Sequence, residues 1–222
     1  MPQDQWTAID RYLTDALLPH DAALAAALAS SDAAGLPAIA VAPNQGRMLE
    51  IFARSIGAKR ILEIGTLGGY STIWLAKALP ADGRLISLEF DPHHAAVAAA
   101  NIAHAGFADL VEVRVGRAID NLPIIEREGR GPFDLVFIDA DKPSNPDYFA
   151  WALKLTAPGS LIIVDNVVRA GAVANADSRD PNVLGVQRMN QMIAAESRVV
   201  ATAVQTVGSK GHDGFALILV TG

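Results

Sequence analysis

The sequence predicts an α/β protein in which helices cover both faces of a mostly parallel sheet. Short runs of β-branched and aliphatic residues recur along the chain, and segments with helical periodicity separate the first five runs. This alternation is typical of parallel sheets covered on both faces. The last two runs are joined by TVGSKGHDG, which is too short for a crossover helix. We therefore expect these two strands to form an antiparallel hairpin at one edge.

The composition favours one globular domain without a nucleic-acid or membrane partner. A chain of 222 residues with 51% hydrophobic residues can bury one large core. The net charge of −6, with no cluster of lysine and arginine, argues against nucleic-acid binding. The absence of cysteine excludes disulfides and thiolate chemistry. The start MPQDQW is unlike a signal peptide, and no apolar stretch is long enough for a membrane span, so we expect a cytoplasmic protein.

The predicted elements follow in a regular order. A helical extension comes first, with helices at 4–18, 21–30 and 44–56. Strands are expected at 60–65, 84–90, 110–115, 133–139, 160–165, 198–205 and 214–220. Helices are expected at 71–79, 92–105 and 145–155, the last with Asn145 as its N-cap before Pro146. We expect a single domain over 1–222, made of the extension 1–57 and an α/β core 58–222.

A glycine-rich turn follows the first strand and indicates a nucleoside site. In EIGTLGGYS, the glycines let the backbone turn sharply and approach a ligand, and the next helix begins there. The second strand ends in Glu89, which is placed to accept both hydroxyls of a ribose. The spacing G-x-x-G-G differs from the G-x-G-x-x-G of dinucleotide enzymes, and no P-loop lysine follows. A turn that only packs a helix on a strand is the structural alternative.

Several motifs together resemble a known family. ILEIGTLGGYSTIWLAKALP, LISLEFDP, FDLVFIDADK and LIIVDNVVRAG, with VAPNQG before the third helix, are similar to the cation-dependent O-methyltransferases. This family contains catechol O-methyltransferase and the caffeoyl-CoA O-methyltransferases. The resemblance runs from about Val41 to the last strand. It implies a Rossmann-like seven-stranded methyltransferase sheet, S-adenosylmethionine as methyl donor, a small aromatic substrate with two vicinal hydroxyls, and a homodimer. The motif positions imply these cofactor-binding residues: Val41, Glu63, Gly65, Thr66, Gly69, Tyr70, Ser71, Glu89, Ala118 and Asp139.

Oxygen ligands end the fourth and fifth predicted strands. Asp139 ends one strand, and Asp165 with Asn166 ends the next. Parallel neighbours would bring these side chains to within about 5 Å of each other. Oxygen ligands without cysteine or histidine select Mg²⁺, Mn²⁺ or Ca²⁺. With the family resemblance, we expect a metal site made of Asp139, Asp165 and Asn166. Taken singly, these residues also suit ordinary turns.

Lys142 is the expected general base, and Asp139 shares the catalytic role. Burial and a nearby cation would favour the neutral amine of Lys142, whereas a surface lysine is the alternative. Asp141 is expected to face solvent or to brace the loop, outside the site. We assign no catalytic role to the five histidines, and His93 and His94 are expected to be solvated.

One position departs from the family pattern. Many relatives have a tryptophan three residues after the Asp-Asn pair, whereas this chain has Arg169. A cation there would pair with a substrate carboxylate or point to solvent, so the substrate stays open. Three other functions are alternatives. They are a metal-independent methyltransferase, a dehydrogenase, and a module that binds S-adenosylmethionine without catalysis.

Overall fold

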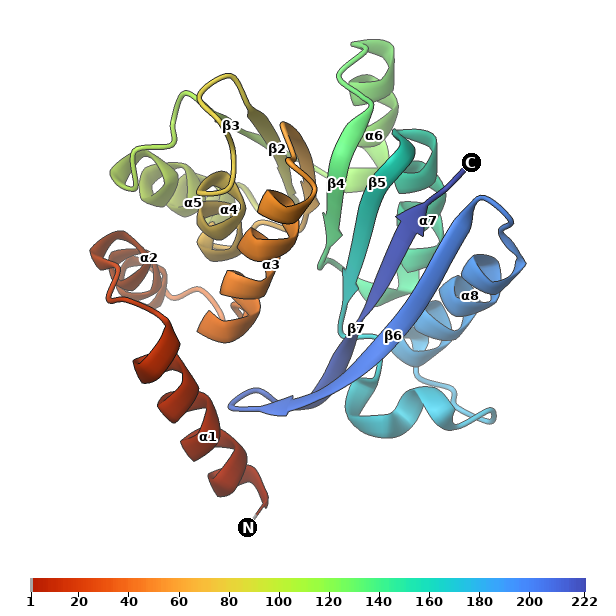
Figure 1. Cartoon of the computed structure of the whole chain (residues 1–222), viewed down its shortest axis with the longest axis horizontal. Coiled ribbons are helices and arrows are strands. Elements are labelled where there is room, and N and C mark those ends of the chain that lie inside the picture. The colour runs from red at the N-terminus through yellow and green to blue at the C-terminus, as the bar shows by residue number, and fades with distance from the viewer. Residues whose placement is uncertain (1) are drawn as a thin grey trace.

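The computed structural model describes residues 2–222 and contains a seven-stranded sheet with the strand order β3-β2-β1-β4-β5-β7-β6 (Figure 1). The five strands β1 to β5 are parallel, and β7 runs antiparallel between β5 and β6. This arrangement confirms the predicted sheet with its antiparallel edge pair. The strands are β1 (Arg60–Ile64), β2 (Arg84–Glu89), β3 (Val111–Val115), β4 (Phe133–Ile138), β5 (Thr156–Asp165), β6 (Val199–Gly208) and β7 (Gly211–Val220).

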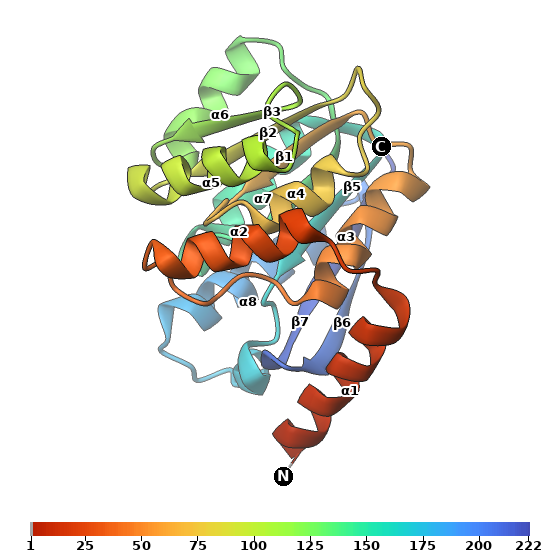
Figure 2. The same ribbon diagram turned by 90° about the vertical axis from the view of Figure 1, so that its left-hand side faces the viewer.

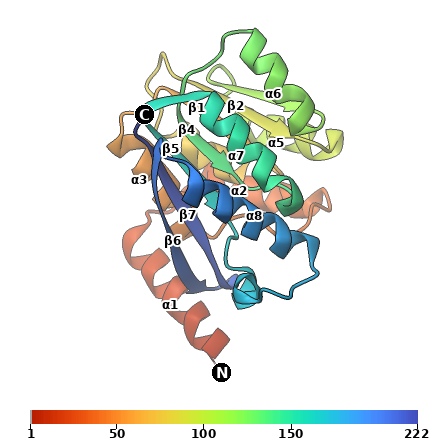
Figure 3. The ribbon, with the colours of Figure 1, turned by 90° about the vertical axis from the view of Figure 1, so that its right-hand side faces the viewer.

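Helices cover both faces of the sheet. Figure 2 shows α2, α3, α4 and α5 on one face, and Figure 3 shows α6, α7 and α8 on the other. Their bounds are α2 (Ala22–Ala33), α3 (Pro43–Ser55), α4 (Tyr70–Ala76), α5 (Pro92–His104), α6 (Ala118–Arg127), α7 (Asn145–Lys154) and α8 (Pro181–Ala195). Two short 3₁₀ helices, η1 (Lys142–Ser144) and η2 (Arg169–Ala174), follow β4 and β5.

Each face of the sheet has its own hydrophobic core. Successive side chains of a strand point to opposite faces, so Ile61 packs with α3, α4 and α5 while Leu62 packs with α6, α7 and α8. Both side chains are fully buried. This two-sided burial explains why the central strands are apolar along their whole length instead of alternating with polar residues.

Helix α1 (Pro2–Leu17) lies against the far edge of the sheet and projects from the body of the molecule (Figure 2). None of the residues 2–17 is buried. Hydrogen bonds from Gln3 and to Asp10 tie the helix to the β6–β7 turn. The Gln3 side-chain amide donates to the Gly208 carbonyl at 3.0 Å, and the Ser209 amide donates to Asp10 Oδ2 at 2.7 Å.

Within residues 2–222, no helix is long and apolar enough to cross a membrane. The cytoplasmic location and the absence of a nucleic-acid partner stay predictions from the sequence.

The structure corrects two local predictions. The last hairpin is tighter than expected, because β6 continues to Gly208 and β7 begins at Gly211, which leaves only Ser209 and Lys210 as the turn. Asn145 is not an N-cap, because the preceding 3₁₀ turn leads directly into α7 and makes Ser144 the capping residue. The Asn145 side chain is buried instead, and neither of its polar atoms has a hydrogen-bond partner within residues 2–222.

Candidate active site

A cavity of about 760 Å³ opens at the carboxyl ends of the central strands. It lies where the strand order reverses, because β1 continues to β2 on one side and has β4 on the other. Such a reversal leaves a crevice between the loops that leave the two strands in opposite directions, and ligands of open α/β sheets bind there. The loops after β1, β2, β4 and β5 all contribute to its wall.

The glycine turn after β1 forms one side of the cavity, and two of its glycines are required by the backbone. Gly65 has φ +102°, and a Cβ atom there would lie 2.2 Å from the carbonyl oxygen of Asp139. Gly69 has φ +83° and precedes α4. Residues with a Cβ atom are disfavoured in this left-handed region. Gly65 therefore allows the loop after β1 to contact the loop after β4, and Gly69 allows the turn to pack against Ala98 of α5.

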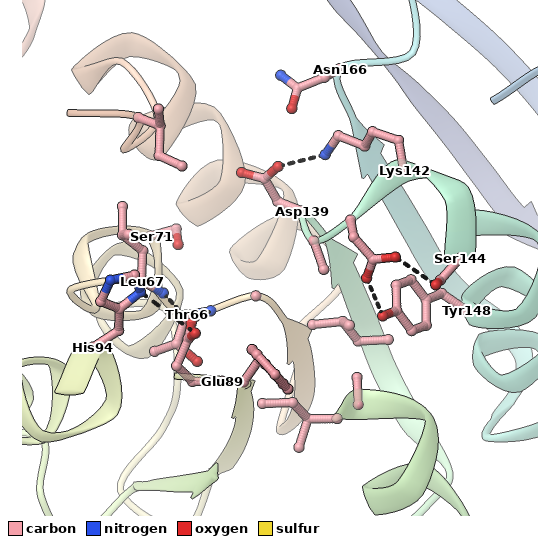
Figure 4. Close-up of a pocket in the computed structure, with 18 of the residues that line it drawn as sticks. Thr66, Leu67, Ser71, Glu89, His94, Asp139, Lys142, Ser144, Tyr148 and Asn166 are labelled. Atoms are coloured by element: carbon pink, nitrogen blue, oxygen red, sulfur yellow. Dashed lines mark hydrogen bonds and ion pairs between the residues drawn. The ribbon is translucent and has the colours of Figure 1, made fainter. Parts of the chain in front are cut away.

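Glu89 fixes the shape of this turn from the end of β2. Its Oε2 accepts the amide protons of Thr66 at 3.2 Å and Leu67 at 2.7 Å, and its Oε1 accepts the amide proton of Asp91 at 3.0 Å. His94 Nδ1 lies 3.7 Å from the same Oε1 and lines the cavity. His94 is therefore a neighbour of the expected ribose site and not a solvated residue, as Figure 4 also shows.

Glu63 lies beneath the turn and is completely buried. Its carboxylate accepts hydrogen bonds from Ser71 Oγ at 2.6 Å, from Ser87 Oγ at 2.6 Å and from the hydroxyl of Thr72. Burial raises the pKa of Glu63 to about 7, although these three hydroxyl donors act in the opposite direction. Glu63 supports the cavity from below, because Ser71 lies between the carboxylate and the cavity wall.

The expected cofactor-binding residues lie around this part of the cavity. The ones in its wall are Val41, Gly65, Thr66, Tyr70, Ser71, Glu89, Ala118 and Asp139. Glu63 and Gly69 stand behind the wall, the first as a buried acid and the second at the N-terminus of α4.

The ends of β4 and β5 bring the expected metal ligands together. Ile138 pairs with Val164 in register, so Asp139 and Asp165 follow side by side. Asp165 is buried, and Asn166 follows it in a left-handed conformation with φ +57° and lines the cavity. Burial and the nearby charge of Asp139 raise the pKa of Asp165 to about 7.

Gln45 is a residue that the sequence analysis did not assign. It lies in α3, in the VAPNQG motif, and its side chain is hydrogen-bonded to Asp165, which lowers the pKa of that carboxyl against the effect of burial. The position of this motif at the start of a helix gave no indication of its partner. The helical extension thus supports the predicted metal site directly.

Lys142 faces the same point. Its side chain is only 8% exposed, and Nζ donates to Asp139 Oδ1 at 2.8 Å. Figure 4 shows Asp139, Lys142 and Asn166 at one end of the cavity, with Glu89, Thr66 and Leu67 at the other. Helix α8 holds the lysine turn closely, because a Cβ atom on Gly185 would lie 2.1 Å from the Lys142 carbonyl oxygen.

Asp141 braces the loop, and it also lines the cavity. It accepts hydrogen bonds from Ser144 Oγ and from the Tyr148 hydroxyl, each at 2.5 Å. Burial and the hydrogen bond to Asp141 both raise the pKa of Tyr148 far above its usual range. Both oxygens of Asp141 are thus hydrogen-bonded to η1 and α7, whereas Asp139 is the carboxylate that accepts a hydrogen bond from Lys142.

The donor set fits a hard divalent cation. Asp139, Asp165 and Asn166 offer only oxygen atoms, and the two adjacent carboxylates repel each other in a partly buried position. Within residues 2–222, no group of three or more His, Cys, Asp and Glu side chains is placed to hold a metal. The candidate site therefore has two charged ligands and one amide. This small number suits Mg²⁺, which keeps several ligand positions for water and substrate.

A sheet of this order, with a glycine turn and an acid at the tips of its first two strands, defines a class I methyltransferase fold. The O-methyltransferase family profile matches residues 22–219. This chain therefore belongs to the O-methyltransferase family, and the predicted enzyme class is confirmed.

Individual proteins of the family are closely similar. The chain is 54% identical to the catechol O-methyltransferase of Niastella koreensis, over 96% of each protein. It is 52% identical to the catechol O-methyltransferase of Mycobacterium tuberculosis, over 96% of this chain and 94% of that protein. The structure of the O-methyltransferase from Bacillus cereus in complex with SAH superposes with a TM-score of 0.98 at 53% identity, covering 99% of this chain and 100% of that one. TomG of Streptomyces achromogenes, an O-methyltransferase in complex with SAM, gives 0.97 at 52% identity over the whole of both chains.

Proposed function

We propose that this enzyme transfers a methyl group from S-adenosylmethionine to one hydroxyl of a small aromatic vicinal diol, with a divalent cation, Mg²⁺ by preference, held by Asp139, Asp165 and Asn166. One observation carries the proposal. The oxygen ligands and Lys142 meet at one end of the cavity whose other end is the glycine turn with Glu89. The relatives named catechol O-methyltransferase support the substrate class, and the complexes of similar enzymes with SAM or SAH support the methyl donor.

The cofactor end of the cavity has an acid and backbone amides that suit a nucleoside. Glu89 holds the Thr66 and Leu67 amides and has lone pairs left to accept ribose hydroxyls. Ser71 belongs to the first turn of α4 and lines the cavity. When bound, the donor supplies a methyl carbon on a sulfonium sulfur, which leaves with the electron pair of the broken C–S bond.

Lys142 accepts the proton from the hydroxyl that becomes methylated. Its Nζ donates to Asp139 Oδ1 at 2.8 Å, so the amine lies at the end of the cavity where the oxygen ligands meet. A divalent cation held by Asp139, Asp165 and Asn166 would lie beside this amine and would make a nearby hydroxyl more acidic. The resulting phenolate attacks the methyl carbon. Much of the acceleration comes from holding the two reactants in one cavity.

The test is methyl transfer to catechol by the purified enzyme, followed by chromatography of the methylated product. We expect activity with Mg²⁺, loss of activity after treatment with EDTA, and recovery when Mg²⁺ is restored. Calorimetric titration of S-adenosylmethionine in EDTA serves as the control, because the glycine turn and Glu89 do not depend on the cation.

Two results would contradict parts of the proposal. Full activity in EDTA would make the enzyme a metal-independent methyltransferase. Binding of S-adenosylmethionine without turnover of any aromatic diol would indicate that the protein is a module that binds S-adenosylmethionine without catalysis.

We also propose that the enzyme is a homodimer. The edge strand β6 exposes Val200 and Val207 to 65% and 52%, and α1 exposes Tyr12 and Leu17 to 70% each. Exposed apolar residues on neighbouring elements support a protein partner at this edge. Sedimentation equilibrium should give twice the chain mass of 23.3 kDa. A monomer at micromolar concentration contradicts this proposal.

A further inference from the structure

Arg169 occupies an unusual turn beside the predicted metal ligands. It lies three residues after Asn166 and lines the same cavity as Asp139 and Lys142. Arg169 and Ala170 both have φ +55°, so two consecutive residues with a Cβ atom are left-handed. This conformation is strained for residues with a Cβ atom, and such residues gather at ligand sites.

Asp213 holds the backbone of this turn in place. Its Oδ1 accepts the amide protons of Val168, Arg169 and Gly214, each at 3.0 Å. The turn is therefore fastened to β7, and the direction in which Arg169 leaves the backbone is fixed. The same hydrogen bonds use up one oxygen of the acid that is nearest to the guanidinium.

The guanidinium itself is incompletely paired. Its Nε is buried and has no hydrogen-bond partner within the described residues 2–222. Its closest ion pair joins NH1 to Asp213 Oδ2 at 4.0 Å, beyond hydrogen-bond distance. The charge of Arg169 also acts on Asp180, which is exposed to solvent. A buried donor without an acceptor is costly, and an arginine fork prefers two parallel bonds to one carboxylate.

We infer that Arg169 is a specificity-determining residue that binds a carboxylate on the aromatic substrate. The inference deepens the proposed function and depends on it. The preferred substrate is then an aromatic acid with two vicinal hydroxyls, in which the hydroxyls face Asp139 and Asn166 while the carboxylate faces Arg169. The paired guanidinium would orient the ring before Lys142 takes the proton. A neutral catechol leaves the guanidinium without this partner and is the poorer substrate.

The experiment compares three substrates and four enzymes. The substrates are 3,4-dihydroxybenzoate, its methyl ester and catechol, so that only the first has the negative charge. The enzymes are the wild type, Arg169→Met, Arg169→Lys and the control Arg179→Met, which removes an exposed arginine outside the cavity. Melting temperatures of all four are measured first, so that a loss of folding is recognised.

For the acid, Arg169→Met should lower kcat/KM by about 10- to 100-fold, mainly through KM, which corresponds to one or two charge-assisted hydrogen bonds. For the ester and catechol the change should stay below about 3-fold, within the margin of non-specific effects. Arg169→Lys should fall between, because it keeps the charge without the fork. Arg179→Met should resemble the wild type on all three substrates.

The inference is overturned if the wild type uses the acid and the ester equally well, or if Arg169→Met affects all three substrates alike, since the arginine would then only support the turn. Calorimetric binding of 3,4-dihydroxybenzoate, with SAH and Mg²⁺ present, gives a readout that does not need turnover. If Arg169→Met binds 3,4-dihydroxybenzoate more weakly than the wild type does, the inference is supported even when no substrate is methylated. The absence of methylation would then contradict the proposed function alone. Unchanged binding overturns the inference while methylation of catechol leaves the proposed function standing.

Discussion

The buried carboxyl of Glu63 should make the stability of the ligand-free enzyme depend on pH. Its folded-state pKa of about 7 lies above the ordinary value of 4.5 because of burial. Below about pH 4.5 the carboxyl is protonated in both folded and unfolded chains. As the pH rises, the unfolded chain releases its proton first, so the folded state loses stability until the pH passes about 7.

The size of this effect follows from the difference between the folded-state and unfolded-state pKa of Glu63. A pKa difference of about 1 corresponds to about 1.4 kcal/mol, so the full loss is about 3 kcal/mol, and about 2 to 3 kcal/mol of it falls between pH 5 and pH 8. Glu63→Gln has no proton to lose there. Its amide can still pair with the hydroxyls of Ser71, Thr72 and Ser87, because a hydroxyl both donates and accepts.

The assay is urea unfolding of both proteins at pH 5, 6, 7 and 8, in EDTA and without cofactor. The free energy of unfolding of Glu63→Gln, minus that of the wild type, should rise with pH by about 2 to 3 kcal/mol. Asp165 is present in both proteins, so its own titration largely cancels in this difference. Parallel curves, or a difference that falls with pH, would refute the reasoning, because the folded-state pKa of Glu63 could not then be raised.

Three other substitutions test the cavity. Gly65→Ala places a Cβ atom 2.2 Å from the Asp139 carbonyl oxygen. Its melting temperature should therefore fall further than that of the control Gly57→Ala, where a Cβ atom meets nothing within 4 Å and the φ of +62° alone costs about 1 kcal/mol. Equal losses of melting temperature would contradict a steric contact at Gly65. Lys142→Met should lower kcat at least about 100-fold and leave the Kd for S-adenosylmethionine unchanged, and a near-normal rate removes the lysine as the base. Glu89→Gln should weaken S-adenosylmethionine binding about 10- to 100-fold in calorimetry, because it removes a charged acceptor. Unchanged affinity argues against a ribose at this acid.

The predicted strands were located well because each is a local pattern. Runs such as LVFI in β4 and LIIV in β5 are apolar on both faces, as expected for a strand that helices cover on both sides. The ends of elements were less certain, since they depend on partners far away in the chain. Thus β6 and β7 continue to Gly208 and Gly211 because each strand extends the other's hydrogen bonding.

Asn145 shows a second limit. Asn before Pro is a common start of a helix, and a helix does begin here, one residue earlier than this preference predicts. The helix follows directly from a 3₁₀ turn that packs against Gly185 of α8, and the cap position falls on Ser144. A propensity states what a residue favours locally, whereas packing decides which of two adjacent residues caps the helix.

The sequence by itself determined the sheet, the glycine turn and the identity of the charged residues at the strand ends, because these are encoded in short runs of the chain. Only the tertiary structure decided how they combine. The parallel pairing of β4 and β5 places Asp139 beside Asp165, α3 brings Gln45 to the same point, and Asp213 of β7 fixes the turn that aims Arg169. These contacts join residues separated by tens of positions or more. Local preferences of the chain do not determine which distant residues come into contact. Burial and hydrogen bonding in the folded core determine it.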